Sequence, residues 1–227
     1  MKHYPKAALG ALVLLAAIPR NLSAEEIKIP GIPIPAVSPD GRLVFRLLDD
    51  QESEFAKRDP GYTLAVVETK AGHPIFILPE TVSVATSHVE DVHVVWSKDS
   101  TRLAINYVAG GGYETTSLFR RDGKTFREMP DPEAVLSEYP AKEKLRQIQK
   151  LGLPANTCQR RISDIFSTRR WIDDDAIEAD AFSQASIVAK GDDLDYVEGL
   201  FRIVAKFDSQ SGQWRVVKSV KKPWRSM

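Results

Sequence analysis

Two histidines and two carboxylates stand close together in the segment His88-Val89-Glu90-Asp91-Val92-His93. Imidazole nitrogens and carboxylate oxygens are both ligands that a zinc ion accepts. In an extended strand, His88 and His93 lie five residues apart and therefore point to opposite faces. They can meet at one ion only if a turn at Glu90 and Asp91 folds the segment back. A metal site formed by His88, Glu90 and His93 is therefore a hypothesis that depends on such a turn. We favour the alternative, in which these residues are the polar first residues of a strand.

A second group of carboxylates, Asp192-Asp193-Leu194-Asp195, follows Gly191. Such oxygens suit Ca²⁺, but the EF-hand spacing fails because Val197 stands where a third oxygen ligand is needed. A solvated loop is therefore the preferred interpretation, and we expect no metal or other cofactor. Loops of this kind can still contact a partner. We predict Tyr113, Asp192, Asp193 and Asp195 as the binding residues.

No known catalytic arrangement is recognisable in the sequence. Gly110-Gly111-Gly112 lacks the Lys-Ser/Thr pair that completes a phosphate-binding loop. The Gly-x-Ser-x-Gly motif of α/β-hydrolases does not occur. Cys158 is the single cysteine, so no intramolecular disulfide can form, and we interpret it as a small buried residue rather than a reactive thiol. No residue is predicted to be catalytic.

The first 24 residues have the pattern of a secretory signal peptide. Lys2 and Lys6 precede an apolar run at 7–18, which is shorter than the roughly 20 residues that span a bilayer. Ser23 and Ala24 are small, so we predict cleavage after Ala24 and a secreted or periplasmic location. An uncleaved anchor is the alternative. Residues 25–35 are proline-rich and are expected to form an extended edge segment or a linker.

The charge of the remaining chain excludes one large class of partners. The 31 basic residues include Lys2, Lys6 and Arg20 of the signal segment, which leaves 28 against 31 acidic residues. A weakly acidic chain supplies no field that attracts phosphates. We therefore expect no nucleic-acid partner and, after signal removal, no membrane span.

Tight turns divide residues 36–222 into about three β-rich modules. The first turn, Ser38-Pro39-Asp40-Gly41, precedes Arg42-Leu43-Val44-Phe45, and Trp96-Ser97-Lys98-Asp99-Ser100 precedes a similar strand at 102–108. A third, less similar copy begins at Trp171. Each is followed by a second turn that ends near Gly72, Gly123 or Gly212. Two turns between β-type segments predict four-stranded antiparallel modules over about 36–79, 89–129 and 160–222.

A helical insertion is expected between the second and third modules, near 131–151. Asp131 can cap a first turn and Pro132 suits the first helical position. Pro140 predicts a break between two short helices. Leu145, Ile148 and Leu151 are expected to form the apolar face of the second one, with the charged segment 142–146 in solvent.

The turns at 38–45 and 96–105 resemble the repeats of TolB-like and WD-repeat-like β-propellers, in which such a turn joins two strands of each blade. The resemblance implies a structural motif, because the aspartate binds local backbone amides and Gly or Ser accepts the tight turn. The spacings, 59 and then about 75 residues, are irregular for that family. Three modules are also fewer than the roughly 4 blades that close a ring.

The expected fold is therefore mainly β, as one β-repeat domain in a propeller-like or open array with a short C-terminal tail at 223–227. A β-sandwich is the alternative. Repeated hairpins without a catalytic group favour an exported binding or scaffolding protein that contacts another protein or an envelope component. An exported hydrolase acting on a glycan or ester is the alternative function.

Overall fold

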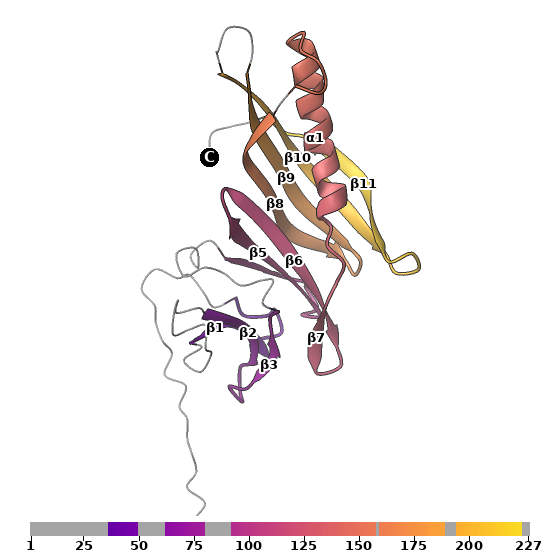
Figure 1. Cartoon of the computed structure of the whole chain (residues 1–227). Coiled ribbons are helices and arrows are strands. Elements are labelled where there is room, and N and C mark those ends of the chain that lie inside the picture. Colours follow the sequence, from indigo (N-terminus) through magenta and orange to yellow (C-terminus); the bar gives the residue numbers. More distant parts are fainter. Residues whose placement is uncertain (1–35, 50–61, 80–91, 158, 189–193, 224–227) are drawn as a thin grey trace, which may run out of the picture.

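The computed structural model describes residues 36–49, 62–79, 92–157, 159–188 and 194–223. Within these ranges the chain is mainly β, as expected, with a single helix (Figure 1). The elements are β1 (Leu43–Asp49), β2 (Tyr62–Glu68), β3 (Pro74–Ile77), β4 (His93–Trp96), β5 (Arg102–Gly110), β6 (Tyr113–Asp122), β7 (Thr125–Glu128), α1 (Glu133–Lys150), β8 (Gln159–Asp173), β9 (Ala176–Val188), β10 (Leu194–Asp208) and β11 (Gln213–Lys221). Among the described residues, no helix combines the length and apolar character needed to cross a bilayer.

The strands form two sheets rather than three separate four-stranded modules. β1, β2 and β3 make a three-stranded antiparallel sheet, and the other eight strands form one larger sheet. The larger sheet consists of two antiparallel meanders, β4–β7 and β8–β11. They are joined by a short parallel pairing of β6 with β8, at Tyr113↔Asp164 and Glu114↔Ile165. The two meanders therefore share one sheet because the first two residues of β6 pair with residues inside β8.

The first two predicted turns have the same hydrogen bonds. The Ser38 hydroxyl donates to Asp40 over 2.6 Å and accepts the Leu43 amide over 3.0 Å. In the second turn Ser97 donates to Asp99 over 2.6 Å and accepts the Arg102 amide over 2.8 Å. The backbone closes each turn with a positive φ, 69° at Gly41 and 61° at Ser100. Local side-chain chemistry therefore sets both turns.

Tryptophan contacts between modules also recur. The indole nitrogen of Trp96 donates to the carbonyl of Ala36 over 3.0 Å. The indole nitrogen of Trp171 donates to Val95 over 3.2 Å. Ala36 and Val95 each stand two residues before the turn serine of their module. The segment at Trp171 thus lies against the second turn as Trp96 lies against the first.

The β4–β7 meander is the middle layer of the molecule, and both of its faces are buried. Leu103, Ile105 and Phe119 point toward β1–β3 and pack there with Phe45 and Leu64. On the other face, Ala104 and Leu118 pack with residues of β8–β11 and α1, among them Phe166, Ile177, Ile203 and Leu136. All residues from Arg102 to Tyr107 are buried as a result. Burial on both faces explains why Leu103, Ala104 and Ile105 are apolar in succession, and the buried Asn106 further along β5 has hydrogen-bond partners on Thr168.

The helix differs from its prediction in two respects. It is continuous from Glu133 to Lys150 and contains Pro140, which costs one backbone hydrogen bond but lies buried against the sheet. A Cβ placed on Gly199 of β10 would lie 2.9 Å from the Cα of Pro140, so helix and strand are in close contact. Packing against β10 therefore stabilises the helix at Pro140, where one backbone hydrogen bond is missing. The helix begins at Glu133 with Pro132 in the N-cap position, one residue later than predicted, and the Asp131 carboxylate accepts the free amide of Glu133 over 2.8 Å.

The buried face of α1 is also not the predicted one. Ile148 is fully buried, but Leu145 and Leu151 are 38% and 46% exposed. The face that packs on the sheet instead carries Leu136, Pro140, Glu143 and Ile148. The expectation that all of the charged segment 142–146 lies in solvent is therefore wrong for Glu143, which is buried, and for Lys144, which is partly buried.

Candidate functional site

The predicted metal residues do not form a site within the described part of the chain. His93 is exposed at the start of β4, whereas His88, Glu90 and Asp91 lie outside the described residues. A search of the described residues finds no group of three or more His, Cys, Asp or Glu side chains that could hold a metal. Cys158 likewise lies outside them.

Tyr113, a predicted binding residue, is a half-buried contact between β6 and α1. Its hydroxyl donates to the carboxylate of Glu133 in the first turn of the helix. Its ring meets Phe166 edge-on at 6.3 Å, and the Arg161 guanidinium lies 5.6 Å from the ring centre. Burial, together with the bond to Glu133, raises the pKa of Tyr113 well above its usual range. The side chain therefore stays protonated and joins two elements.

Next to Tyr113 lies a polar group that the sequence analysis missed, formed by Lys144, Ser183 and Asp164. The Lys144 ammonium donates to the Ser183 hydroxyl over 2.7 Å, and Ser183 in turn donates to the carboxylate of Asp164. Ser183 is only 5% exposed. Asp164 and Ser183 are cross-strand partners on β8 and β9, and Lys144 reaches them from α1. We call these three residues the bridged ion pair.

Serine and lysine side by side can also be a nucleophile and its base. Burial lowers the pKa of Lys144, while the charge of Asp164 opposes that shift. A general base, however, has to accept the serine proton, and here that proton is given to Asp164. The arrangement therefore holds a charged lysine and a carboxylate together through a hydroxyl. Its evident effect is to fasten α1 to the sheet.

A sequence signal for this group does exist. On β9 the residues facing α1 alternate as Ile177, Ala179, Ala181, Ser183, Ala185 and Ile187. Ser183 is the polar member of that stripe, and a buried hydroxyl needs a partner. The identity of the partners could not be read from the sequence, because Lys144 and Asp164 are brought in by separate elements.

A second buried polar group, centred on Glu143, attaches α1 to β10 and β11. Glu143 is 7% exposed and accepts hydrogen bonds from Arg146, Gln147 and Lys221 of β11. The bonds from Arg146, with those from Lys221 and Gln147, hold the pKa of Glu143 far below its usual range although burial opposes them. Gln147 also exchanges two hydrogen bonds with the backbone of Glu198. Its amide thereby continues the ladder of β10 beyond the end of β11.

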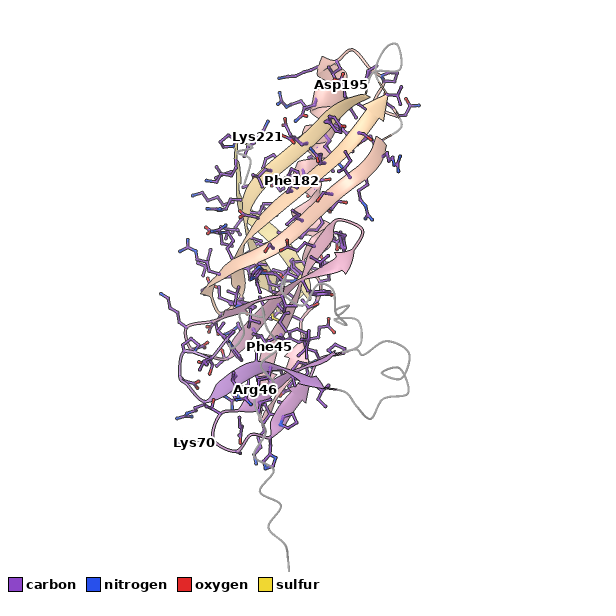
Figure 2. The ribbon with its side chains drawn as sticks, turned by 90° about the vertical axis from the view of Figure 1, so that its left-hand side faces the viewer. Phe45, Arg46, Lys70, Phe182, Asp195 and Lys221 are labelled. Atoms are coloured by element: carbon purple, nitrogen blue, oxygen red, sulfur yellow. The ribbon has the colours of Figure 1, made fainter. Side chains whose placement is uncertain are left out.

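The far end of the β9–β10 pair presents apolar side chains to solvent. Tyr196 is 60% exposed and Val188 is 58% exposed. Val188 pairs with Leu194 and Ser186 pairs with Tyr196, so Val188 and Tyr196 are diagonal neighbours on one face. Asp195, a predicted binding residue, is also exposed at this end of the sheet, remote from Phe45 and Arg46 (Figure 2). It pairs with Ile187, so its side chain lies on the opposite face of the strands from Tyr196 and Val188. Asp192 and Asp193 lie outside the described residues.

Comparison with known proteins gives no family for this chain. No protein-family model and no curated protein matches it. A solved prolyl endopeptidase structure is similar over 83% of this chain, with 12% sequence identity and a TM-score of 0.28. The aligned region spans 35% of that protein. At this TM-score the similarity carries no argument about fold or activity.

Proposed function

We propose that the protein is an exported β-repeat binding protein that contacts another protein through the end of its β9–β10 pair. The carrying observation is the exposed pair Tyr196 and Val188, which share one face at the end of these two strands. Tyrosine is among the residues that most often dominate binding energy in protein interfaces. An exposed tyrosine with an adjacent valine therefore matches the composition of a small contact surface.

The support beneath this surface favours binding without rearrangement. On the opposite face of the same strands, Ile187 and Val197 are buried with Ala185 and Ile148 of α1. Gln147 and the bridged ion pair attach the helix nearby. Tyr196 is thus carried by a packed sheet, which reduces the entropy that binding costs.

Export and repeat architecture are parts of the same proposal. The basic start, the short apolar run and the small residues before Glu25 favour secretion or transfer to the periplasm. The recurring turn bonds and the recurring tryptophan contacts favour a propeller-like stacking of β-modules over a two-layer sandwich. A scaffold of this kind presents hairpin ends to partners.

Among the described residues, Ser183 and Lys144 provide the chemical argument for the alternative function, hydrolysis of a glycan or ester. Ser183 is buried and donates its proton to Asp164, which opposes a nucleophilic role. A fluorophosphonate probe, which labels activated serines, distinguishes the two functions. We expect no labelling of Ser183; labelling that is lost in Ser183→Ala would favour the hydrolase.

The binding proposal is tested with tagged full-length protein in the envelope of its source cell. Tyr196→Ala should abolish recovery of a cross-linked partner without changing the midpoint of thermal unfolding. Ile172→Ala is the matched control, because Ile172 is 47% exposed at the turn between β8 and β9. Equal recovery with both variants would contradict the assignment of Tyr196.

A further inference from the structure

Arg160 of β8 lies on the same face of the sheet as Tyr196. Arg160 pairs with Ser186 of β9, and Ser186 pairs in turn with Tyr196 of β10. Residues that are paired across neighbouring strands direct their side chains to the same face. Arg160 and Tyr196 are both exposed, whereas Ser186 between them is half-buried. A short side chain therefore separates two long exposed ones, and Val188 is the diagonal neighbour of Tyr196 on this face.

Among the four arginines of β8, Arg160 differs from the others because it forms no ion pair with any described residue. The other three each have a carboxylate partner: Arg161–Asp164 at 3.8 Å, Arg169–Asp180 at 2.8 Å and Arg170–Glu178 at 3.2 Å. The strand register explains the difference. Arg170 stands opposite Glu178 on β9, whereas Arg160 stands opposite the uncharged Ser186. The described sheet therefore supplies a counter-charge for Arg170 but not for Arg160.

The acids next to Tyr196 on β10 do not serve as this counter-charge. Glu198 lies on the same face as Tyr196, and its carboxylate accepts a hydrogen bond from the Gln184 amide over 3.2 Å. Asp195 precedes Tyr196 in the sequence and points to the other face. The Arg160 guanidinium therefore keeps its five N–H donors available to a carboxylate from outside the molecule. Arginine and tyrosine are also among the residue types that most often dominate binding energy at interfaces.

We propose that the surface formed by Arg160, Tyr196 and Val188 binds a protein segment that carries a carboxylate close to an aromatic or aliphatic side chain. This inference rests on the binding surface proposed above and adds the chemistry of the partner. The apolar side chain lies against Tyr196 and Val188, and the carboxylate accepts two hydrogen bonds from the Arg160 guanidinium. Two strand spacings separate Arg160 from Tyr196 by about 10 Å, which is the length of about three residues of extended chain. The partner's acid is therefore expected within about three residues of its apolar side chain.

Peptides selected from a random phage-displayed library on the full-length protein test this chemistry. The peptides that no longer bind Tyr196→Ala use the surface, and we expect them to carry Asp or Glu near an aromatic or aliphatic residue. Arg160→Gln should weaken their binding about tenfold. The matched control, Arg215→Gln, should leave it unchanged, because Arg215 is exposed on β11 near the other end of β10. In a double-mutant cycle, replacing the peptide acid with its amide should cost the wild type about tenfold and Arg160→Gln almost nothing.

Three results would overturn the inference, and they differ in what they say about the binding surface. Peptides that depend on Tyr196 but bind Arg160→Gln as tightly as the wild type would refute the acidic partner and leave the surface at Tyr196 intact. If Tyr196→Ala releases no peptide, the surface itself is contradicted, and the inference with it. An equal loss of binding with Arg160→Gln and Arg215→Gln would assign the effect to net charge rather than to one contact.

Discussion

Replacing Ser97 with alanine removes the hydroxyl around which the second turn is built. Ser97 is 5% exposed and directly follows β4, at the turn that leads into β5 in the middle layer of the molecule. Its oxygen accepts the Arg102 amide over 2.8 Å and its proton is donated to Asp99 over 2.6 Å. Alanine at this position fits the space but leaves the Arg102 amide, which is in a buried region, without that acceptor.

The magnitude follows from these two bonds. A hydrogen bond to a charged group contributes about 1.5–3 kcal/mol, and a buried donor without a partner costs about 1–3 kcal/mol. The two contributions overlap because they share one hydroxyl and are lost together. We expect Ser97→Ala to reduce the free energy of unfolding by about 2–4 kcal/mol, which corresponds to roughly 5–15 °C in the unfolding midpoint of a chain of this size.

Urea unfolding followed by tryptophan fluorescence measures this loss. Ser38→Ala should have a similar effect, because the first turn has the same bonds with lengths of 2.6 and 3.0 Å. Ser209→Ala, in the exposed turn between β10 and β11, is the control and should change the free energy by less than about 0.5 kcal/mol. A loss below about 0.5 kcal/mol for Ser97→Ala would refute the structural role assigned to the hydroxyl.

Three further predictions concern stability. Although burial opposes the shift, bonds from Ser97 and Thr101 lower the pKa of Asp99 from 3.8 to about 2, so its ionised form favours the folded state. That stabilisation should be complete above pH ~4 and be lost between pH ~4 and ~2. In Asp99→Asn, the midpoint of urea unfolding should therefore depend less on pH over this interval. Asn106→Ala removes two 2.8 Å bonds to the Thr168 backbone that join the meanders, and should cost about 2–5 kcal/mol in thermal unfolding; a loss below ~1 kcal/mol would contradict this. Gly199→Val should cost about 1–3 kcal/mol in urea because its Cβ meets α1, and an unchanged midpoint would show that the helix can move away.

The features that were predictable from the sequence are those set by neighbouring residues. Ser38, Asp40, Ser97 and Asp99 form their turns through bonds within six residues, so their type and spacing were sufficient. The bond that Asp131 accepts from the Glu133 amide is local in the same sense. The predominance of strands also follows from short β-type segments between turns.

Features that depend on distant residues were not predictable. The helix continues through Pro140 because β10 packs against it at Gly199. Glu143 is buried because Lys221, far along the chain, provides a counter-charge. The joining of two modules into one sheet rests on the β6–β8 pairing, which no local pattern reveals.

The position of the candidate site in the chain was predictable from the sequence, but most of the residues that form it were not. Asp195 marks the exposed end of the β9–β10 pair, but Tyr196 and Val188 were not identified. Their exposure depends on which strand face α1 covers, and that follows only from the packing. Tyr113 directly follows Gly110-Gly111-Gly112, a pattern that indicates a loop, whereas its hydroxyl bond to Glu133 depends on a helix that begins twenty residues later.

A photo-activated cross-linking residue placed at Tyr196 tests the central claim most directly. It would be introduced into the full-length protein in its source cells, with a second protein carrying it at Lys124 in the exposed β6–β7 turn as the control. We predict one discrete protein adduct from position 196 that Val188→Ser removes, and none from position 124. No adduct at 196, or the same adducts from both positions, would contradict a binding surface at this end of the sheet.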